Sequence, residues 1–570
     1  MKSFFKCVFI TMFLLAACAM RVAGAEAPTN STSAPRILHL IFFVRQLDAR
    51  MENSEARMFD TLVREIEQLK KYNLKATFLL QYDALLNPKY QELMKQEMAR
   101  GCEVGGWWEI TQPHVEATGL KWRGRYPWDW YSDVGFSVGY ALPDREHFVD
   151  LYMAKFKAVF GKHPTAVGSW FIDEHTLKYM SDTYHIVASC NCKDQVGTDN
   201  YTLWGGYWNQ AYYPSFKNSF MPAQTIENQI PVPIFRMLGS DPIYQYDDWG
   251  EGDNGQGVIT LEPVYRESGM KESWVRWFLK TLTEEPCLAF NYAQAGQENS
   301  FTWDMVSKGL EMQLPIIASL ATSGKLKLET LSETGIWFKQ AFPLTPATAF
   351  TATTDPRNEG RKTVWYNSRF YRANLFWENN TLRFRDIHLF DENVKSDYLT
   401  QTATSKHAAY YTLPVVDGFV WSVKGGTPAG LRLVKVNAEG RVSEIKGGAP
   451  VVTELSKDAL QVRWPMDGAG VIRITFYEDR FEIFSSAKER QGWMFELTAD
   501  SKAELPFTTI TSQKISATFR KNTYVVECTE GTVVAKNSPE QNFVFRLIPV
   551  NERIVVKMKE NRYECAKQSV

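Results

Sequence analysis

Short apolar runs alternate with segments of helical periodicity between Ile37 and about Glu333. Ile37 to Val44 is a near-continuous apolar run, and Met58, Leu62 and Ile66 then recur at helical spacing. Strands that are covered on both faces read as continuous apolar runs, whereas half-exposed strands alternate apolar and polar residues. The repeated order of strand and helix therefore predicts a parallel sheet covered by helices.

This pattern predicts about seven strands with helices between or after them. We expect strands at residues 37–44, 75–80, 103–109, 166–172, 186–190, 233–237 and 287–292. We expect helices that begin at Ser54, as a capping residue, and at Pro88, and others over 143–160, 274–282 and 303–320. About seven strand–helix units favour a (β/α)7-type barrel over an open sheet.

After about Ala341 the pattern changes. Residues 471–476 and 481–484 alternate apolar and polar side chains on either side of a tight turn, which predicts a hairpin. Residues 542–548 and 553–558 repeat this alternation. We therefore predict a barrel domain at 37–340, as the catalytic domain, and an antiparallel β-sandwich at 341–570. A chain of 570 residues is too long for one core, which agrees with two domains.

The first 25 residues have the pattern of an export signal, and residues 26–36 that of a flexible tether. Lys2 and Lys6 precede an apolar run that is too short to anchor the chain in a bilayer. The stretch ending at Cys18 resembles a bacterial lipobox, whereas cleavage before Glu26 would follow the ordinary small-residue rule. The spacing favours lipidation of Cys18. We expect a periplasmic, outer-membrane or secreted protein, with membrane contact only through this anchor.

Charge and aromatic content restrict the class of ligand. With 64 Lys and Arg against 65 Asp and Glu, the chain has no electrostatic footprint for nucleic acid or an anionic membrane surface. Half of its 18 tryptophans lie between residues 107 and 249. Indoles in such number suit a concave surface for flat, amphipathic ligands such as sugars, although they also pack well in cores. We therefore expect a carbohydrate partner.

Carboxylates and aromatic residues follow several of the expected strands. In parallel α/β folds function lies at the carboxyl ends of the strands, and glycoside cleavage needs two acids beside the bond. The predicted catalytic residues are Asp173, Glu109 and Asp241. Asp173 could instead cap a helix, and Asp241 could start a turn. The predicted substrate-binding residues are Asp48, Trp107, Trp108, His114, Trp170, Asp194 and Trp208.

Two short motifs resemble known families. Residues 101–109, with a proline shortly after, resemble a motif of family 57 glycoside hydrolases. Residues 168–173 are similar to a second motif of that family, whose last carboxylate is the catalytic nucleophile, and this implies that role for Asp173. Residues 75–80 and 103–105 resemble strands of polysaccharide deacetylases. These families share a (β/α)7 barrel that is often followed by a β-rich domain, so the resemblance implies the same architecture here.

The chain also departs from these families. The deacetylase metal site needs an early Asp-Asp pair and two spaced histidines, but Trp107 and Thr111 stand where the histidines would fall. We therefore expect no metal and no other cofactor. Where family 57 has its general acid, near the seventh strand, this chain offers Asn291, Gln294 and Glu298. Residues 192–213 match neither family.

The sequence thus favours an exported glycoside hydrolase that uses two carboxylates in an aromatic-lined cleft. Two alternatives stay open: a polysaccharide deacetylase with a rearranged metal site, and a non-catalytic glycan-binding protein on a degenerate barrel.

Overall fold

The computed structural model describes residues 34–250, 255–437, 439–468, 470–486, 492–536 and 542–559. The export signal, both of its cleavage sites and most of the tether lie outside the described residues. From Pro35 onward the described residues belong to one compact unit. None of the described helices is both long and apolar enough to span a bilayer.

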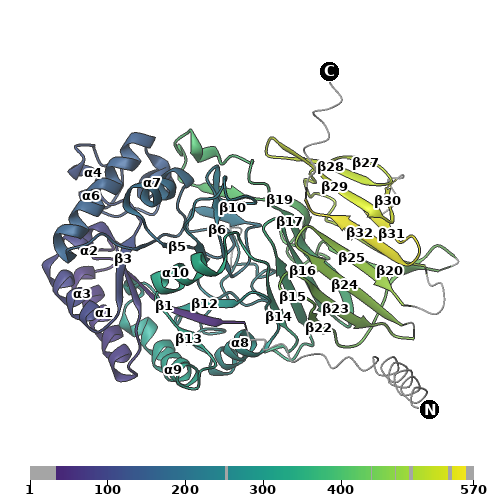
Figure 1. The fold of residues 1–570 in the computed structure, drawn as a ribbon, viewed down its shortest axis with the longest axis horizontal. Helices are drawn as coiled ribbons and strands as arrows, with labels where there is room; N and C mark the ends of the chain where they lie inside the picture. The colour runs from purple at the N-terminus through teal and green to yellow at the C-terminus, as the bar shows by residue number, and fades with distance from the viewer. Residues whose placement is uncertain are drawn as a thin grey trace, which may run out of the picture. The chain divides into compact units, whose positions relative to one another are not determined.

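Seven parallel strands form the first sheet among the described residues, and helices cover its outer face (Figure 1). The spatial order is β12 (Asn291–Ala295), β1 (Arg36–Val44), β2 (Thr77–Leu80), β3 (Glu103–Trp107), β4 (Ala166–Gly168), β5 (Ala188–Asn191) and β11 (Ile234–Arg236). Two short strands are added to it: β8 (Ala211–Tyr212), antiparallel to β11, and β13 (Lys327–Leu328), parallel to β1. The predicted (β/α)7-type barrel is confirmed.

The helices begin and end largely where the sequence predicts. Pro88 occupies the first turn of its helix, and Gly161 ends another with a φ of 78°. Ser54 is not the capping residue, because Asn53 holds that position and makes no side-chain cap. The helices are α1 (Ser54–Lys71), α2 (Tyr82–Leu86), α3 (Pro88–Ala99), α4 (Gln112–Ala117), α5 (Ser132–Gly135), α6 (Leu142–Phe160), α7 (Glu174–Tyr184), α8 (Glu272–Glu284), α9 (Trp303–Thr322) and α10 (Leu331–Ala341).

Side chains rather than a strand ladder join the two ends of the barrel sheet. No backbone ladder links β11 and β12 among the described residues. Instead, the backbone N–H of Leu238 donates to Gln294, and Gln210 donates to Asn291, at 2.7 and 2.8 Å. The barrel is therefore nearly closed.

Helix α10 covers the amino-terminal end of the barrel. The N–H of Leu331 donates to Thr77 at the start of β2, and Ser332 donates to Glu103 at the start of β3. At Gly335 the helix approaches β5 so closely that a Cβ would lie 2.6 Å from the Ala188 side chain. Because this end is closed, a ligand site can form only at the carboxyl ends of the strands or on the outer surface.

Two antiparallel sheets follow α10 and pack face to face, so the predicted sandwich is confirmed as well. Phe384 of one sheet contacts Phe476 and Phe481 of the other, with ring centroids 6.2 and 5.1 Å apart. The larger sheet contains β14 (Thr348–Ala352), β15 (Lys362–Asn367), β16 (Tyr371–Glu378), β17 (Thr381–Leu389), β19 (Leu413–Asp417), β20 (Gly430–Val436), β21 (Val442–Glu444), β26 (Trp493–Thr498), β30 (Thr532–Ala535) and β31 (Phe545–Ile548). The smaller sheet contains β22 (Val451–Glu454), β23 (Leu460–Pro465), β24 (Val471–Tyr477), β25 (Arg480–Ser485), β27 (Phe507–Ile510), β28 (Lys514–Phe519), β29 (Asn522–Glu530) and β32 (Arg553–Lys557).

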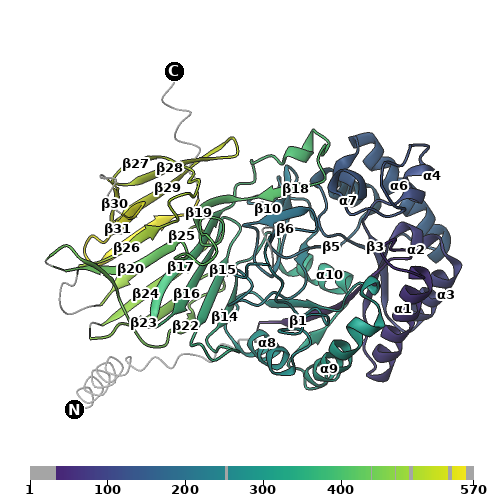
Figure 2. The ribbon, with the colours of Figure 1, turned by 180° about the vertical axis from the view of Figure 1, so that it is seen from behind.

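The connection between β17 and β19 leaves the sandwich and packs on the barrel half. Within it, β18 (Ala408–Tyr411) pairs in parallel with β7 (Tyr201–Trp204), which forms a hairpin with β6 (Gln195–Thr198) (Figure 2). The backbone oxygens of Tyr398 and Gln401 accept hydrogen bonds from Arg145 on α6. A small sheet of three strands therefore contains residues from both halves of the chain.

Candidate active site

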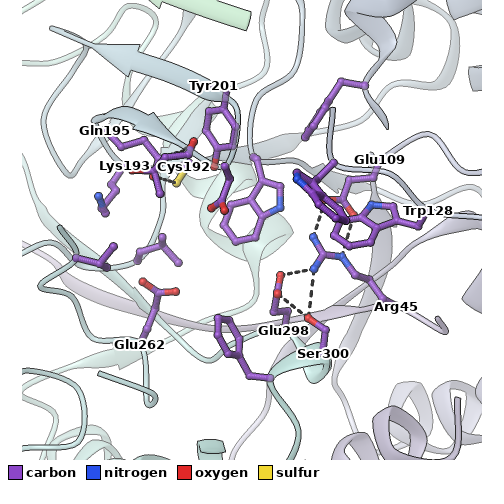
Figure 3. A pocket seen from close by; sticks show the side chains of 18 of the residues that line it. Arg45, Glu109, Trp128, Cys192, Lys193, Gln195, Tyr201, Glu262, Glu298 and Ser300 are labelled. Carbon is purple, nitrogen blue, oxygen red and sulfur yellow. Dashed lines mark hydrogen bonds and ion pairs between the residues drawn. The ribbon is translucent and has the colours of Figure 1, made fainter. Parts of the chain in front are cut away.

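A cavity of about 330 Å³ lies at the carboxyl ends of the barrel strands (Figure 3). Residues just beyond β1, β3, β4, β5, β11 and β12 line it, together with the β6–β7 hairpin and the segments 128–136 and 258–265. Its charged lining residues are Arg45, Arg50, Glu109, Lys193, Asp199, Glu262 and Glu298. Its aromatic lining residues are Trp128, Trp130, Phe136, Trp170, Tyr201, Tyr265 and Phe301.

Arg45, just beyond β1, binds two glutamates of this cavity. Its Nε and Nη2 donate to the two oxygens of Glu109 at 2.9 and 2.6 Å, and its Nη1 donates to Glu298 at 2.6 Å. Gln81 and Ser300 donate further hydrogen bonds to Glu109 and Glu298 respectively. Burial lowers the pKa of Arg45, but the two carboxylates outweigh burial and the net shift is upward. The guanidinium is therefore a fixed positive charge.

Guanidinium groups also lie over two of the cavity's indoles. Trp128 has Arg45 at 4.2 Å and Arg50 at 5.4 Å from its ring, and Trp130 has Arg50 at 4.6 Å and Arg125 at 4.5 Å. Such contacts hold a ring in place but occupy its face. Among the described residues no cation lies over Trp170, so neither a guanidinium nor an ammonium group occupies the face of its ring.

Glu262 is a buried carboxyl without an ion-pair partner among the described residues. Thr260 and Gln297 donate to its two oxygens at 2.7 and 2.5 Å. Burial raises the pKa of Glu262 to about 7, and these hydrogen bonds and Lys193 oppose the rise only partly. Near neutral pH a large fraction of this carboxyl carries a proton, so it can act as an acid.

Asp199 lies at the tip of the β6–β7 hairpin. Asp199 and Asn200 form its two-residue turn with φ values of 52° and 62°, a conformation that Asp and Asn tolerate better than most residues. The side chain is accessible, and in the described part of the chain no hydrogen bond or ion pair involves its carboxylate. Partial desolvation raises the pKa of Asp199, whereas Arg45, Arg50 and Lys193 oppose this shift. The cavity thus contains one carboxyl group that is partly protonated near neutral pH and one without a hydrogen-bond or ion-pair partner among the described residues.

Glu109 and Trp170 are the two residues of the sequence prediction that line the cavity. The other two predicted catalytic acids do not line it. Asp173 is fully buried at the N-cap of α7, where it binds Arg145, Ser137 and Thr176. Asp241 is also buried and accepts hydrogen bonds from the Trp274 indole and two backbone N–H groups. Their catalytic roles stay predictions, and their present contacts are those of structural carboxylates.

The remaining predicted binding residues are buried or paired. Trp107 stacks on Phe43 at 4.2 Å, Trp108 packs against His114 at 5.6 Å, and His114 also contacts the Phe148 carbonyl oxygen. The others are Trp208, stacked on Trp365 at 3.8 Å; Asp194, paired with Arg236 and Arg372; and Asp48, paired with Arg50. None of these lines the cavity. Asp194 nevertheless lies next to the cavity, because Lys193, the residue before it in the sequence, is a lining residue.

The sequence does not predict Arg45 or Glu262 as site residues. It offers Glu298 only as one of three side chains near the seventh strand, and it leaves Asp199 as a residue that either binds ligand or orders a long loop. Arg45 and Glu298 follow strands, as the predicted site residues do. Without the fold, however, the sequence does not tell which of several residues after a strand faces a cavity. The Asp199-Asn200 pair between two β-type runs is a recognisable hairpin signal. Glu262 lies between β11 and α8, where no periodicity marks its position.

The metal site of polysaccharide deacetylases does not fit these residues. Among the described residues no three His, Cys, Asp or Glu side chains are grouped so that they could hold a metal ion. At the end of β1 the chain has Arg45, whose guanidinium already neutralises the nearest carboxylates.

No protein-family model matches the sequence, and no curated protein matches it. A solved structure described as a glycoside hydrolase/deacetylase from Parabacteroides distasonis is similar, with 13% identity over 67% of this chain and 90% of that chain and a TM-score of 0.49. A 4-alpha-glucanotransferase from Thermococcus litoralis is similar at 10% identity over 92% and 99%, with a TM-score of 0.33. A family 4 carbohydrate esterase from Streptomyces lividans is similar at 10% identity over 53% and 97%, with a TM-score of 0.24. The names of these proteins do not agree on one reaction.

Proposed function

We propose that the protein hydrolyses glycosidic bonds in this cavity, with Glu262 as the general acid and Asp199 as the second carboxylate. The observation that carries the proposal is the difference between these two acids. Glu262 is buried and has a pKa near 7, whereas Asp199 is accessible and without a partner in the described chain. Glycoside hydrolysis requires one carboxyl group that donates a proton and one that is ionised, and the burial of Glu262 against the exposure of Asp199 favours this division of roles.

In this mechanism Glu262 donates its proton to the oxygen that leaves as the glycosidic bond breaks. Positive charge develops on the sugar ring, and the ionised Asp199 stabilises it. Asp199 then either bonds to the anomeric carbon, as a nucleophile, and water breaks this bond while the ionised Glu262 takes its proton, or Asp199 takes a proton from a water whose oxygen bonds to the anomeric carbon. A carboxyl separation of about 5–5.5 Å favours the first route with retention, and about 6.5–9.5 Å favours inversion.

Glu109 and Glu298 have a different role in this proposal. Both accept hydrogen bonds from Arg45, and together they hold its guanidinium against Trp128. They therefore fix the shape and charge of the cavity wall rather than exchange protons with the substrate. Trp170 supplies the apolar face against which a sugar ring packs.

The test is release of new reducing ends from a panel of polysaccharides by the wild type and two variants. Asp199→Asn and Glu262→Gln should each lower turnover by about 10²–10⁴-fold, the usual contribution of such groups. Asp182→Asn, at an exposed position on α7, serves as the matched control and should keep full activity. Full activity in Asp199→Asn, or loss of activity only in Asp173→Asn, would refute this assignment. Sugar binding without any turnover would favour the non-catalytic alternative.

A further inference from the structure

Lys193 is the cation of the cavity that lacks a carboxylate partner. Arg45 is paired with two glutamates and Arg50 with Asp48. The Lys193 Nζ donates one hydrogen bond, at 3.2 Å, to the backbone oxygen of Asp194. No carboxylate of the described residues lies within ion-pair distance of it. An ammonium group has three donors, so two of them have no partner within the described part of the chain.

This arrangement is unfavourable in the free protein. Lys193 is only 1% exposed, and burial without a paired anion disfavours the charged form of an amine. Burial accordingly lowers the pKa of Lys193, although nearby acids oppose this shift. A methionine of similar length at this position would avoid the free-energy cost of burying a charge. A ligand that brings its own negative charge into the cavity would remove it as well.

Lys193 also lies close to the proposed reaction centre. It interacts electrostatically with both Glu262 and Asp199. Figure 3 shows Lys193, Gln195 and Glu262 along one side of the cavity and Arg45, Glu109 and Trp128 along the other. A group bound by the ammonium would therefore belong to the sugar whose bond is cleaved, or to its direct neighbour.

We propose that Lys193 selects a sugar with a negatively charged substituent, either the carboxylate of a uronic acid or a sulfate ester. This inference rests on the proposed function, because it uses the same cavity. An anionic oxygen would accept the two free N–H groups of the ammonium in a charge-assisted contact that excludes water.

The test measures the affinity of D-glucuronate, D-glucose 6-sulfate and D-glucose at constant ionic strength by calorimetry. The wild type should bind one of the two acidic sugars at least tenfold more tightly than glucose, and the better one identifies the substituent. Lys193→Met should lose this preference, whereas Lys193→Arg should keep it. Lys178→Met, on the exposed face of α7, is the matched control and should bind like the wild type. Equal binding of all three sugars by the wild type, or an unchanged preference in Lys193→Met, would overturn the inference.

These outcomes are separable from those of the proposed function. Hydrolysis of neutral glycans that depends on Asp199, with no preference for acidic sugars, would leave the proposed function standing and refute the role of Lys193. A preference for acidic sugars that depends on Lys193, without turnover of any glycan, would support the binding role and refute the hydrolase. Circular dichroism of each lysine variant establishes that it folds.

Discussion

Replacing Glu262 by glutamine should stabilise the protein at alkaline pH while it removes activity. Folding raises the pKa of this carboxyl from 4.5 to about 7 because the group is buried. A folded pKa above the unfolded one means that the folded state holds the proton more tightly. The contribution of Glu262 to the stability of the wild type is therefore fully present below pH 4.5 and is lost as the pH rises through 7. At about 1.36 kcal/mol per pH unit, the loss is about 3 kcal/mol when the group is fully ionised.

The variant escapes this loss because a glutamine amide is neutral at every pH. Its oxygen can still accept from Gln297, and its N–H can donate to the Thr260 hydroxyl. In a chain of this length 1 kcal/mol corresponds to about 1 °C in Tm, so we expect a gain of about 2–3 °C at pH 8. At pH 5 the expected gain is below about 1 °C, because little of the loss has accrued.

Differential scanning calorimetry of the wild type and Glu262→Gln at pH 5 and pH 8 measures both differences. Glu116→Gln, an exposed glutamate on α4, controls for the loss of a surface charge and should show no pH-dependent gain. A variant that is no more stable than the wild type at pH 8, or equally stabilised at both pH values, would refute the reasoning about Glu262. A stabilised variant with undiminished activity would support the raised pKa of Glu262 but contradict its role as the general acid.

Three further predictions concern the same cavity. The kcat/KM of the wild type should fall about tenfold per pH unit above pH 7 as Glu262 loses its proton, and a profile that stays flat to pH 9 would contradict this. Arg45→Met should lower the free energy of unfolding by about 3–5 kcal/mol at pH 7, because it leaves two carboxylates without their cation. Calorimetry should show that this loss becomes smaller towards pH 4, and a variant with the Tm of the wild type would contradict the prediction. Trp208→Ala should lower the free energy of unfolding by about 3–5 kcal/mol, because it removes the stack with Trp365, whereas Trp170→Ala should mainly weaken sugar affinity. Calorimetry measures both effects. A destabilised Trp170→Ala with unchanged sugar affinity, or a Trp208→Ala that is as stable as the wild type, would contradict these assignments.

The order of strands and helices could be predicted because each element has a local signature. Apolar runs such as Ile37 to Val44 become buried parallel strands, and Pro88 and Gly161 mark helix ends. The closure of the barrel between β11 and β12 could not be predicted. It depends on contacts such as Leu238 with Gln294, which join residues far apart in the sequence through side chains and have no periodicity.

The sequence predicts that the candidate site lies at the carboxyl ends of the strands, but it predicts only some of the residues that line it. Glu109 and Trp170 follow strands and line the cavity, as the rule for strand ends indicates. Asp173 also follows a strand and resembles a catalytic motif, yet its oxygens bind Arg145 and the first turn of α7. Sequence cannot separate these cases, because a carboxylate that caps a helix and one that faces a cavity occupy the same positions after a strand.

The pairing of β18 with β7 has a consequence for biosynthesis. Tyr201 and Leu203 are buried in a sheet whose third strand begins at Ala408, so about 200 residues must be translated before that sheet is complete. At about 5–20 residues per second this takes about 10–40 s. Through that interval the hairpin that carries Asp199 lacks its neighbour and exposes apolar surface to chaperones and to other nascent chains. The small sheet that carries Asp199 can therefore be completed only after most of the polypeptide has left the ribosome.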